Sequence, residues 1–203
     1  MPYFYSVNKD VQHEIKLKRS RFICNLHYCK TLIEAKEYIQ QINKEYQTAN
    51  HNCWAYIVGE NGENAHSSDA GEPSGSAGKP MLNTLRKHDM TNIVAVVTRY
   101  FGGVKLGIRG LIDAYAMAVE ETIAQDSLKK IVNYSYYSIN LNYDFIEKFK
   151  YDIGELSAEI YKINYAAKID VTLMIEDIMV TGLENYLQEM SGKKKITYKS
   201  ITL

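Results

Sequence analysis

The chain has 203 residues, of which 46% are hydrophobic and 24% charged, and its 24 basic and 24 acidic side chains give a formal net charge of zero. This composition excludes a disordered chain and is typical of a folded globular protein with one or two domains. Any affinity for nucleic acid would therefore come from local clusters of charge. The three cysteines show no disulfide pattern and no stretch is apolar enough for a membrane span, so we expect a cytoplasmic protein.

The first part of the chain alternates between patterns typical of strands and of helices. Thr31 and Glu34 form a capping-box pattern, which marks the start of a helix, and Ser20-Arg21 is the expected turn between the first two strands. Residues 92–101 are almost continuous in β-branched side chains, which indicates a strand buried on both faces. The expected elements are strands at 9–18, 20–28, 51–59 and 92–101 and helices at 31–46 and 79–87. A further helix is expected to bury Leu111, Tyr115, Ala118 and Val119 and to run to about Gln125.

After Lys130 the chain contains nine of its 17 tyrosines and few glycines. The patterns there predict strand, helix, strand, strand, helix and strand at 131–141, 143–153, 157–163, 167–175, 177–190 and 194–202. That order predicts a ferredoxin-like domain with both helices on one face of an antiparallel sheet. We therefore expect an α+β protein with two domains, 1–132 and 133–203.

The segment 66–115 is rich in glycine, and part of it has an unusual excess of positive charge. From Gly78 to Gly110 there are six basic residues and one acid, Asp89. Glycine turns at helix starts expose backbone N–H groups, which together with lysine and arginine can bind phosphates. The alternative is that these charges point in different directions and only keep the surface soluble. The basic residues are Lys79, Arg86, Lys87, Arg99, Lys105 and Arg109.

Two other basic motifs have a plain structural interpretation. The turn Gly102-Gly103 with Lys105 and Gly107 has neither the spacing of a P-loop nor that of a dinucleotide loop, so a tight strand-to-helix turn is favoured. The cluster 193–195 (three lysines) could reach a phosphate backbone, but a solvated turn is the default interpretation.

The same region contains residue types that can carry out chemistry. Asp69 and Glu72 could act as a pair of acids, although in so polar a loop we expect them to organise the loop through hydrogen bonds. His51 and Cys53 face the same side of their strand, and with His66 they could hold a metal or form a thiol nucleophile with its base. A lone strand cysteine is more often a small buried hydrophobe, so we expect no metal and no cofactor.

These residues resemble the signature of the IMPACT/YigZ family, and the resemblance covers essentially the whole chain. It implies a first domain similar to domain IV of elongation factor G and a second, ferredoxin-like domain similar to its domain V. Eukaryotic members regulate translation by binding the activator of a starvation-sensing initiation-factor kinase. The matching positions are Gly78, Met81-Leu82, Leu85, Met90, Val96-Val97, Arg99-Tyr100-Phe101, Gly102-Gly103 and Leu106-Gly107.

The leading hypothesis is a non-enzymatic, monomeric regulator associated with translation, which binds RNA, the ribosome or a translation factor. We expect Arg99→Ala or Lys105→Ala to weaken that binding without unfolding the protein. The competing hypothesis is a hydrolase or other small-molecule enzyme that uses Asp69, Glu72, His51 or Cys53. The proposed basic face consists of Lys79, Arg99, Lys105 and Arg109 with Gly102 and Gly103.

Overall fold

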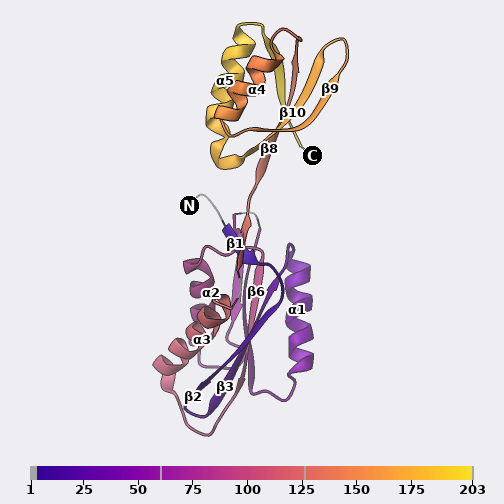
Figure 1. Cartoon of the computed structure of the whole chain (residues 1–203). Helices are drawn as coiled ribbons and strands as arrows, with labels where there is room; N and C mark the ends of the chain where they lie inside the picture. The colour runs from indigo at the N-terminus through magenta and orange to yellow at the C-terminus, as the bar shows by residue number, and fades with distance from the viewer. Residues whose placement is uncertain (1–3, 60, 126, 203) are drawn as a thin grey trace. The chain divides into compact units, whose positions relative to one another are not determined.

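The computed structural model describes residues 4–59, 61–125 and 127–202, which form two compact units that meet in the sequence between Ile131 and Val132. The fold is mixed α and β, as predicted (Figure 1). Among the described residues, no helix is long and apolar enough to cross a membrane.

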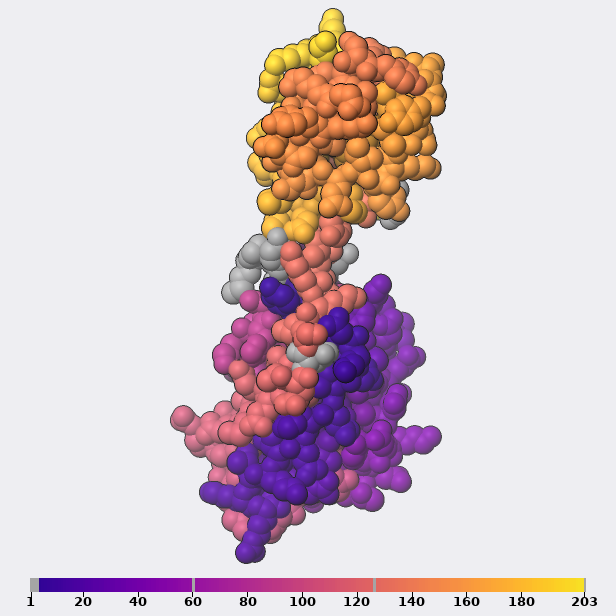
Figure 2. All heavy atoms as spheres, in the orientation of Figure 1, coloured from indigo at the N-terminus to yellow at the C-terminus, as the bar shows by residue number. Residues whose placement is uncertain are grey.

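The first unit is built on a five-stranded antiparallel sheet in the order β2-β3-β6-β4-β5. The central strand β6 is buried along seven of its eight residues, which confirms the prediction of a strand covered on both faces. In the space-filling view, β2 and β3 form a continuous indigo band over this unit (Figure 2). The strands are β2 (Val11–Leu17), β3 (Ser20–Tyr28), β4 (His51–Val58), β5 (Asn64–Ser68) and β6 (Ile93–Tyr100).

Helices cover both faces of this sheet. The helices α2 (Gly78–Lys87) and α3 (Gly107–Ile123) pack on one face over the larger core, and α1 (Leu32–Glu45) packs on the other (Figure 1). The predicted start of α1 is confirmed, because the Thr31 side chain accepts a hydrogen bond from the Glu34 N–H at 3.2 Å.

Three features of this unit were not expected. The strand β5 lies in what we expected to be loop, and β1 (Phe4–Val7) pairs with β7 (Leu128–Ile131) in a separate two-stranded sheet. The turn expected at Ser20-Arg21 lies instead at Lys18-Arg19, whose φ angles are +43° and +69°. Positive φ at both positions is the geometry of a type I′ hairpin turn, which glycine, asparagine and aspartate usually signal and these two residues do not.

Two glycines fix how the pieces of the first unit come together. A Cβ atom on Gly102 would lie 2.0 Å from the Arg19 carbonyl oxygen, so only glycine lets the end of β6 cross the β2–β3 turn. A Cβ atom on Gly78 would lie 2.7–2.8 Å from the Ser68 backbone, so glycine also allows α2 to begin against β5. Glycine at these two positions therefore allows backbone segments to pack closely against each other.

The second unit has the predicted strand, helix, strand, strand, helix, strand order, and its antiparallel sheet has the order β11-β8-β10-β9. Both helices cover one face of the sheet over their own core (Figure 1). This is the ferredoxin-like arrangement that we expected, whereas the likeness to elongation factor G domains stays a prediction. The elements are β8 (Tyr134–Leu141), α4 (Ile146–Glu155), β9 (Glu159–Tyr165), β10 (Ile169–Glu176), a 3-10 turn (Asp177–Met179), α5 (Val180–Gly192) and β11 (Ile196–Ile201).

Candidate functional site

A pocket of about 380 Å³ lies in the first unit, where the start of β4 and the end of β6 meet the start of α3. Its walls are mostly apolar, with a small group of polar side chains from β4, β6 and the loop after β5. Such a combination is typical of ligand sites. The lining residues are Asn50, His51, Glu72, Pro73, Arg99, Phe101, Lys105, Leu106, Gly107, Ile108 and Leu111.

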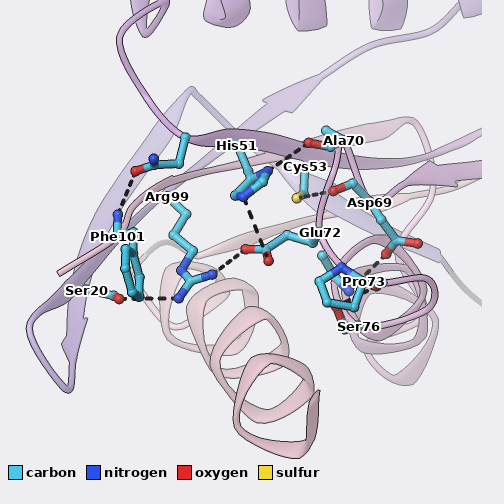
Figure 3. Close-up of polar contacts among 12 residues, drawn as sticks. Ser20, His51, Cys53, Asp69, Ala70, Glu72, Pro73, Ser76, Arg99 and Phe101 are labelled. Atoms are coloured by element: carbon cyan, nitrogen blue, oxygen red, sulfur yellow. Dashed lines mark hydrogen bonds and ion pairs between the residues drawn. The ribbon is translucent and has the colours of Figure 1, made fainter. Parts of the chain in front are cut away.

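A buried ion pair borders this pocket. Arg99 Nη1 donates to Glu72 Oε1 at 2.7 Å, and the two side chains are only 6% and 3% exposed (Figure 3). The Tyr115 hydroxyl, which is fully buried in α3, donates to the same carboxylate oxygen at 2.8 Å. A buried charge pair requires such additional hydrogen bonds, because its desolvation is unfavourable. Glu72 therefore links the loop to β6 and α3.

The burial of Arg99 departs from our expectation that it lies on an exposed basic face. Arg99 is opposite His51 of β4 and Phe22 of β3 in the sheet register, so it points toward the helices α2 and α3. Its guanidinium carbon lies 5.3 Å from the centre of the Phe22 ring and 5.5 Å from that of Phe101, within cation–π range. Phosphate contact through this residue would require the Glu72 ion pair to open.

Arg99 also reaches the β2–β3 turn. Its Nη2 lies 3.4 Å from the Ser20 hydroxyl oxygen, which also accepts from the Gly102 N–H at 3.3 Å. Among the described residues, Arg99 Nε is buried without a hydrogen-bond partner. An unsatisfied donor of this kind is rare in a folded protein.

The ring of His51 is held in a fixed orientation at the pocket. Its Nδ1 lies 3.0 Å from the Ala70 carbonyl oxygen, which can only accept, so Nδ1 carries a proton. The other nitrogen, Nε2, lies 3.9 Å from Glu72 Oε2 (Figure 3), and both residues are among those that line the pocket. In neutral histidine this Nε2 is an acceptor, and in protonated histidine it is a donor beside the carboxylate.

The loop after β5 is organised by Asp69. Its carboxylate accepts hydrogen bonds from the N–H groups of Gly75, Ala77 and Gly78 at 2.8, 3.0 and 2.9 Å. Partial burial raises the pKa of this carboxyl, but the three backbone donors outweigh it and hold the pKa below its usual value. Glu72 acts differently from our expectation, because its carboxylate binds Arg99 and Tyr115 side chains rather than the loop backbone.

Cys53 is fully buried beneath this loop. Its Sγ lies 2.9 Å from the Asp69 carbonyl oxygen and 3.4 Å from the Tyr115 hydroxyl oxygen, and its one S–H can donate to either. Burial raises the pKa of this thiol to about 12, so it stays protonated at neutral pH. Cys53 is therefore a packed core side chain, and a protonated thiol of this kind is a poor nucleophile.

The candidate metal-binding side chains do not converge. In the part of the chain that the structure describes, no three histidine, cysteine, aspartate or glutamate side chains are grouped so that they could hold a metal ion. His66 contacts the Tyr56 ring at a centroid separation of 5.8 Å, on the strand pair β4–β5.

Comparison with known proteins identifies the family of this chain. The family model described as the Impact N-terminal domain matches residues 18–123. IMPACT family member YvyE of Bacillus subtilis is 36% identical over 98% of this chain and 92% of its own length. The chain belongs to the IMPACT family. IMPACT family member YigZ of Escherichia coli is 32% identical over 87% of both chains.

A solved structure described as that of a hypothetical protein shares the fold of this IMPACT chain along nearly its full length. It superposes with a TM-score of 0.64 at 26% identity and covers 100% of this chain and 98% of that one.

In this IMPACT chain, the other three basic residues of the proposed face are exposed. Lys105 lies at the pocket, whereas Lys79 lies in the first turn of α2 and is not among the pocket residues. The Arg109 side chain is 91% exposed, with Asp113 at 3.7 Å. Gly103 has φ +83°, so Gly102 and Gly103 together form the turn that carries the chain toward Lys105.

Sequence reasoning missed four side chains of this IMPACT site. We assigned Ser20 to a turn and Tyr115 to a helix face, and we gave Asn50 and Phe101 no role. The Asn50 side chain accepts from the Phe101 N–H at 2.8 Å, which fixes the backbone beside the 44% exposed Phe101 ring. The exposed aromatic of the family signature was the one available signal, because the other contacts exist only in the folded unit.

Proposed function

We propose that this IMPACT family protein binds single-stranded RNA within the translation machinery, with the pocket and the turn before α3 as the contact surface. The family resemblance supports the role in translation, since eukaryotic members are expected to regulate that process. The observation that carries the RNA proposal is a half-exposed aromatic ring, Phe101, at a 380 Å³ pocket that also contains Lys105. Aromatic rings stack with bases, and lysines neutralise the phosphates between them.

The start of α3 adds a second attraction for phosphate. Leu106, Gly107 and Ile108 line the pocket, and the helix that begins at Gly107 has no side-chain cap and no acid in its first turn. Its first N–H groups are therefore available to an anion and lie at the positive end of the helix dipole. We infer that a base stacks on Phe101 while the adjacent phosphate lies between Lys105 and the start of α3.

The test is binding of a fluorescent single-stranded RNA oligonucleotide to the full chain across a salt series. Affinity is expected to fall with salt, with a slope of about −0.7 for each phosphate neutralised. Lys105→Ala is expected to reduce the slope by about one contact, and Phe101→Ala to weaken binding by about 1–3 kcal/mol, the usual effect of losing one stacked base.

Lys36→Ala is the matched control, because Lys36 is an exposed lysine on α1, which packs on the opposite face of the sheet. Equal affinity of the wild type, Phe101→Ala and Lys105→Ala would contradict the proposal. If the chain binds the ribosome or a protein factor but has no affinity for RNA alone, the contact surface recognises a different class of partner.

The enzymatic alternative depends on one observation, the orientation of His51 Nε2 beside Glu72 at the pocket. Such a nitrogen could accept a proton from a bound hydroxyl or water. Turnover of an ester or phosphodiester substrate that is lost in His51→Asn, with the fold intact, would favour this function over simple binding.

A further inference from the structure

A second hollow, of about 180 Å³, lies in the ferredoxin-like unit at one end of its sheet. The turn after α5, the turn between β9 and β10, and the segment after β8 surround it. Three lysines, two asparagines, a serine and a threonine line it, together with two isoleucine or leucine side chains, and no carboxylate is among them. The residues on which the inference depends are Asn142, Lys168, Ser191, Lys194, Lys195 and Thr197.

The three lysines of this hollow lack the ion pairs that three other lysines of the described part of the same unit form. Lys148, Lys150 and Lys193 each form an ion pair with a nearby carboxylate. Within the described residues, no such pair is found for the three lysines of the hollow. The acid nearest in the sheet, Asp170, accepts a hydrogen bond from the Asn140 side chain at 2.8 Å. Three like charges around one hollow repel one another, and a bound anion would relieve that repulsion.

A purely structural explanation covers only part of this cluster. Lysines at the C-terminal end of a helix interact favourably with the helix dipole, which accounts for Lys194 and Lys195 after α5. Lys168 belongs to the β9–β10 turn and gains nothing from that dipole. Its presence in the same hollow is the observation that points to a ligand.

The turn after α5 holds its two lysines in a defined backbone geometry. The Lys194 N–H donates to the Ser191 carbonyl at 2.9 Å, and the Lys195 N–H donates to the Met190 carbonyl at 3.0 Å. These two bonds form a Schellman motif, in which Lys194 occupies the left-handed position with φ +56° that glycine normally fills. The Lys195 ammonium lies 5.9 Å from the centre of the buried Phe145 ring.

We propose that this hollow, the lysine pocket, binds a phosphate group. Ammonium, amide and hydroxyl groups supply the donors that phosphate oxygens accept. At 180 Å³ the lysine pocket is smaller than the 300–1,000 Å³ typical of sites for whole organic ligands, so it suits one phosphate rather than a nucleotide. The phosphate can be a free anion or a phosphodiester of an RNA strand, and the proposal does not depend on the site in the first unit.

The first experiment is a titration of the ¹⁵N-labelled full chain with inorganic phosphate, followed by NMR at constant ionic strength with chloride as the comparison anion. Saturable shifts are expected at the amides of Asn142, Lys168 and 194–197, and chloride is expected to produce none of them. A second arm uses a dinucleotide with one phosphodiester. Saturation by inorganic phosphate alone identifies a free anion as the ligand, and saturation by both identifies a site that also accepts an RNA backbone.

The variants separate binding from folding. Lys194→Gly removes an ammonium but places glycine at the left-handed position, so the melting temperature should stay or rise while the phosphate affinity falls about tenfold. Lys168→Gln should lower affinity by a similar factor. Lys162→Gln, an exposed lysine of β9 outside the lysine pocket, is the matched control and should bind like the wild type.

Shifts spread evenly over exposed lysines, or an equal loss of affinity in Lys162→Gln, would overturn the proposal in favour of general charge attraction. Absence of saturable shifts would overturn it as well. Because Phe101 and Lys105 belong to the other unit, failure of either proposal leaves the result for the other intact.

Discussion

Removal of the Arg99 guanidinium should destabilise the first unit strongly. The side chains of Arg99 and Glu72 are 6% and 3% exposed and their charged atoms are 2.7 Å apart. Arg99→Met would leave the buried Glu72 carboxylate without its ion-pair partner, although the hydrogen bond from the Tyr115 hydroxyl would stay. Breaking a buried ion pair on one side reduces the free energy of unfolding by about 3–5 kcal/mol. For a unit of this size, that corresponds to a fall in melting temperature of roughly 10–20 °C.

Urea and thermal denaturation, followed by circular dichroism of the full chain, would measure this loss. The matched control is Arg109→Met, which removes the same group from a 91% exposed side chain and should change the free energy of unfolding by less than about 0.5 kcal/mol. The double variant Glu72→Gln with Arg99→Met should recover at least about 1 kcal/mol, because no charge then stays buried. A loss below about 1 kcal/mol in Arg99→Met, or no recovery in the double variant, would refute the reasoning.

Two further predictions concern the loop and the thiols. The folded pKa of Asp69 lies below its ordinary value of 3.8, so the stabilisation by its hydrogen bonds is present above that value and is lost as the pH falls through the folded pKa. The free energy of unfolding of Asp69→Asn should therefore depend less on pH than that of the wild type as the pH falls from about 5 toward about 2, and equal pH dependence would contradict this role. The three thiols are buried (Cys24, Cys29 and Cys53), and burial raises the pKa of each to about 12. A chromogenic disulfide reagent at pH 8 should label none of them before unfolding, and stoichiometric labelling of the native chain would show that a thiol is accessible.

Local sequence patterns predicted most helices and strands, because the residues that determine each of these elements lie within the element itself. The β-branched run of β6 and the capping residues of α1 could be interpreted without knowledge of the partners. The pairing of β1 with β7 could not, since these short strands are more than 120 residues apart in the sequence and neither has a strong periodic pattern. The Lys18-Arg19 turn was missed because its residues are atypical for positive φ.

The candidate site also depends on contacts between residues that are distant in the sequence. The sequence singled out Asp69, Glu72, His51 and Arg99 as residues of interest, and the fold brings the last three together at one pocket. It could not show that Arg99 is buried, because that depends on the loop after β5 folding over the end of β6. An arginine near the end of a strand is usually assigned to the surface, and only the tertiary structure places Glu72 beside it.

We propose that the two units fold independently, and the sheet formed by β1 and β7 defines where the chain should be cut. Phe4 pairs with Ile131 and Val7 with Leu128, so a fragment that ends near Lys130 loses part of this sheet, whereas residues 1–132 keep it whole. Val7 is 1% exposed in the main core, and Leu128 packs against that core. Fragment 1–132 should therefore unfold in one cooperative thermal transition, and fragment 1–125, which lacks β7, should melt at a lower temperature. Loss of a cooperative transition in fragment 1–132 would mean that its core requires the second unit, and equal melting temperatures would mean that β7 contributes nothing to stability.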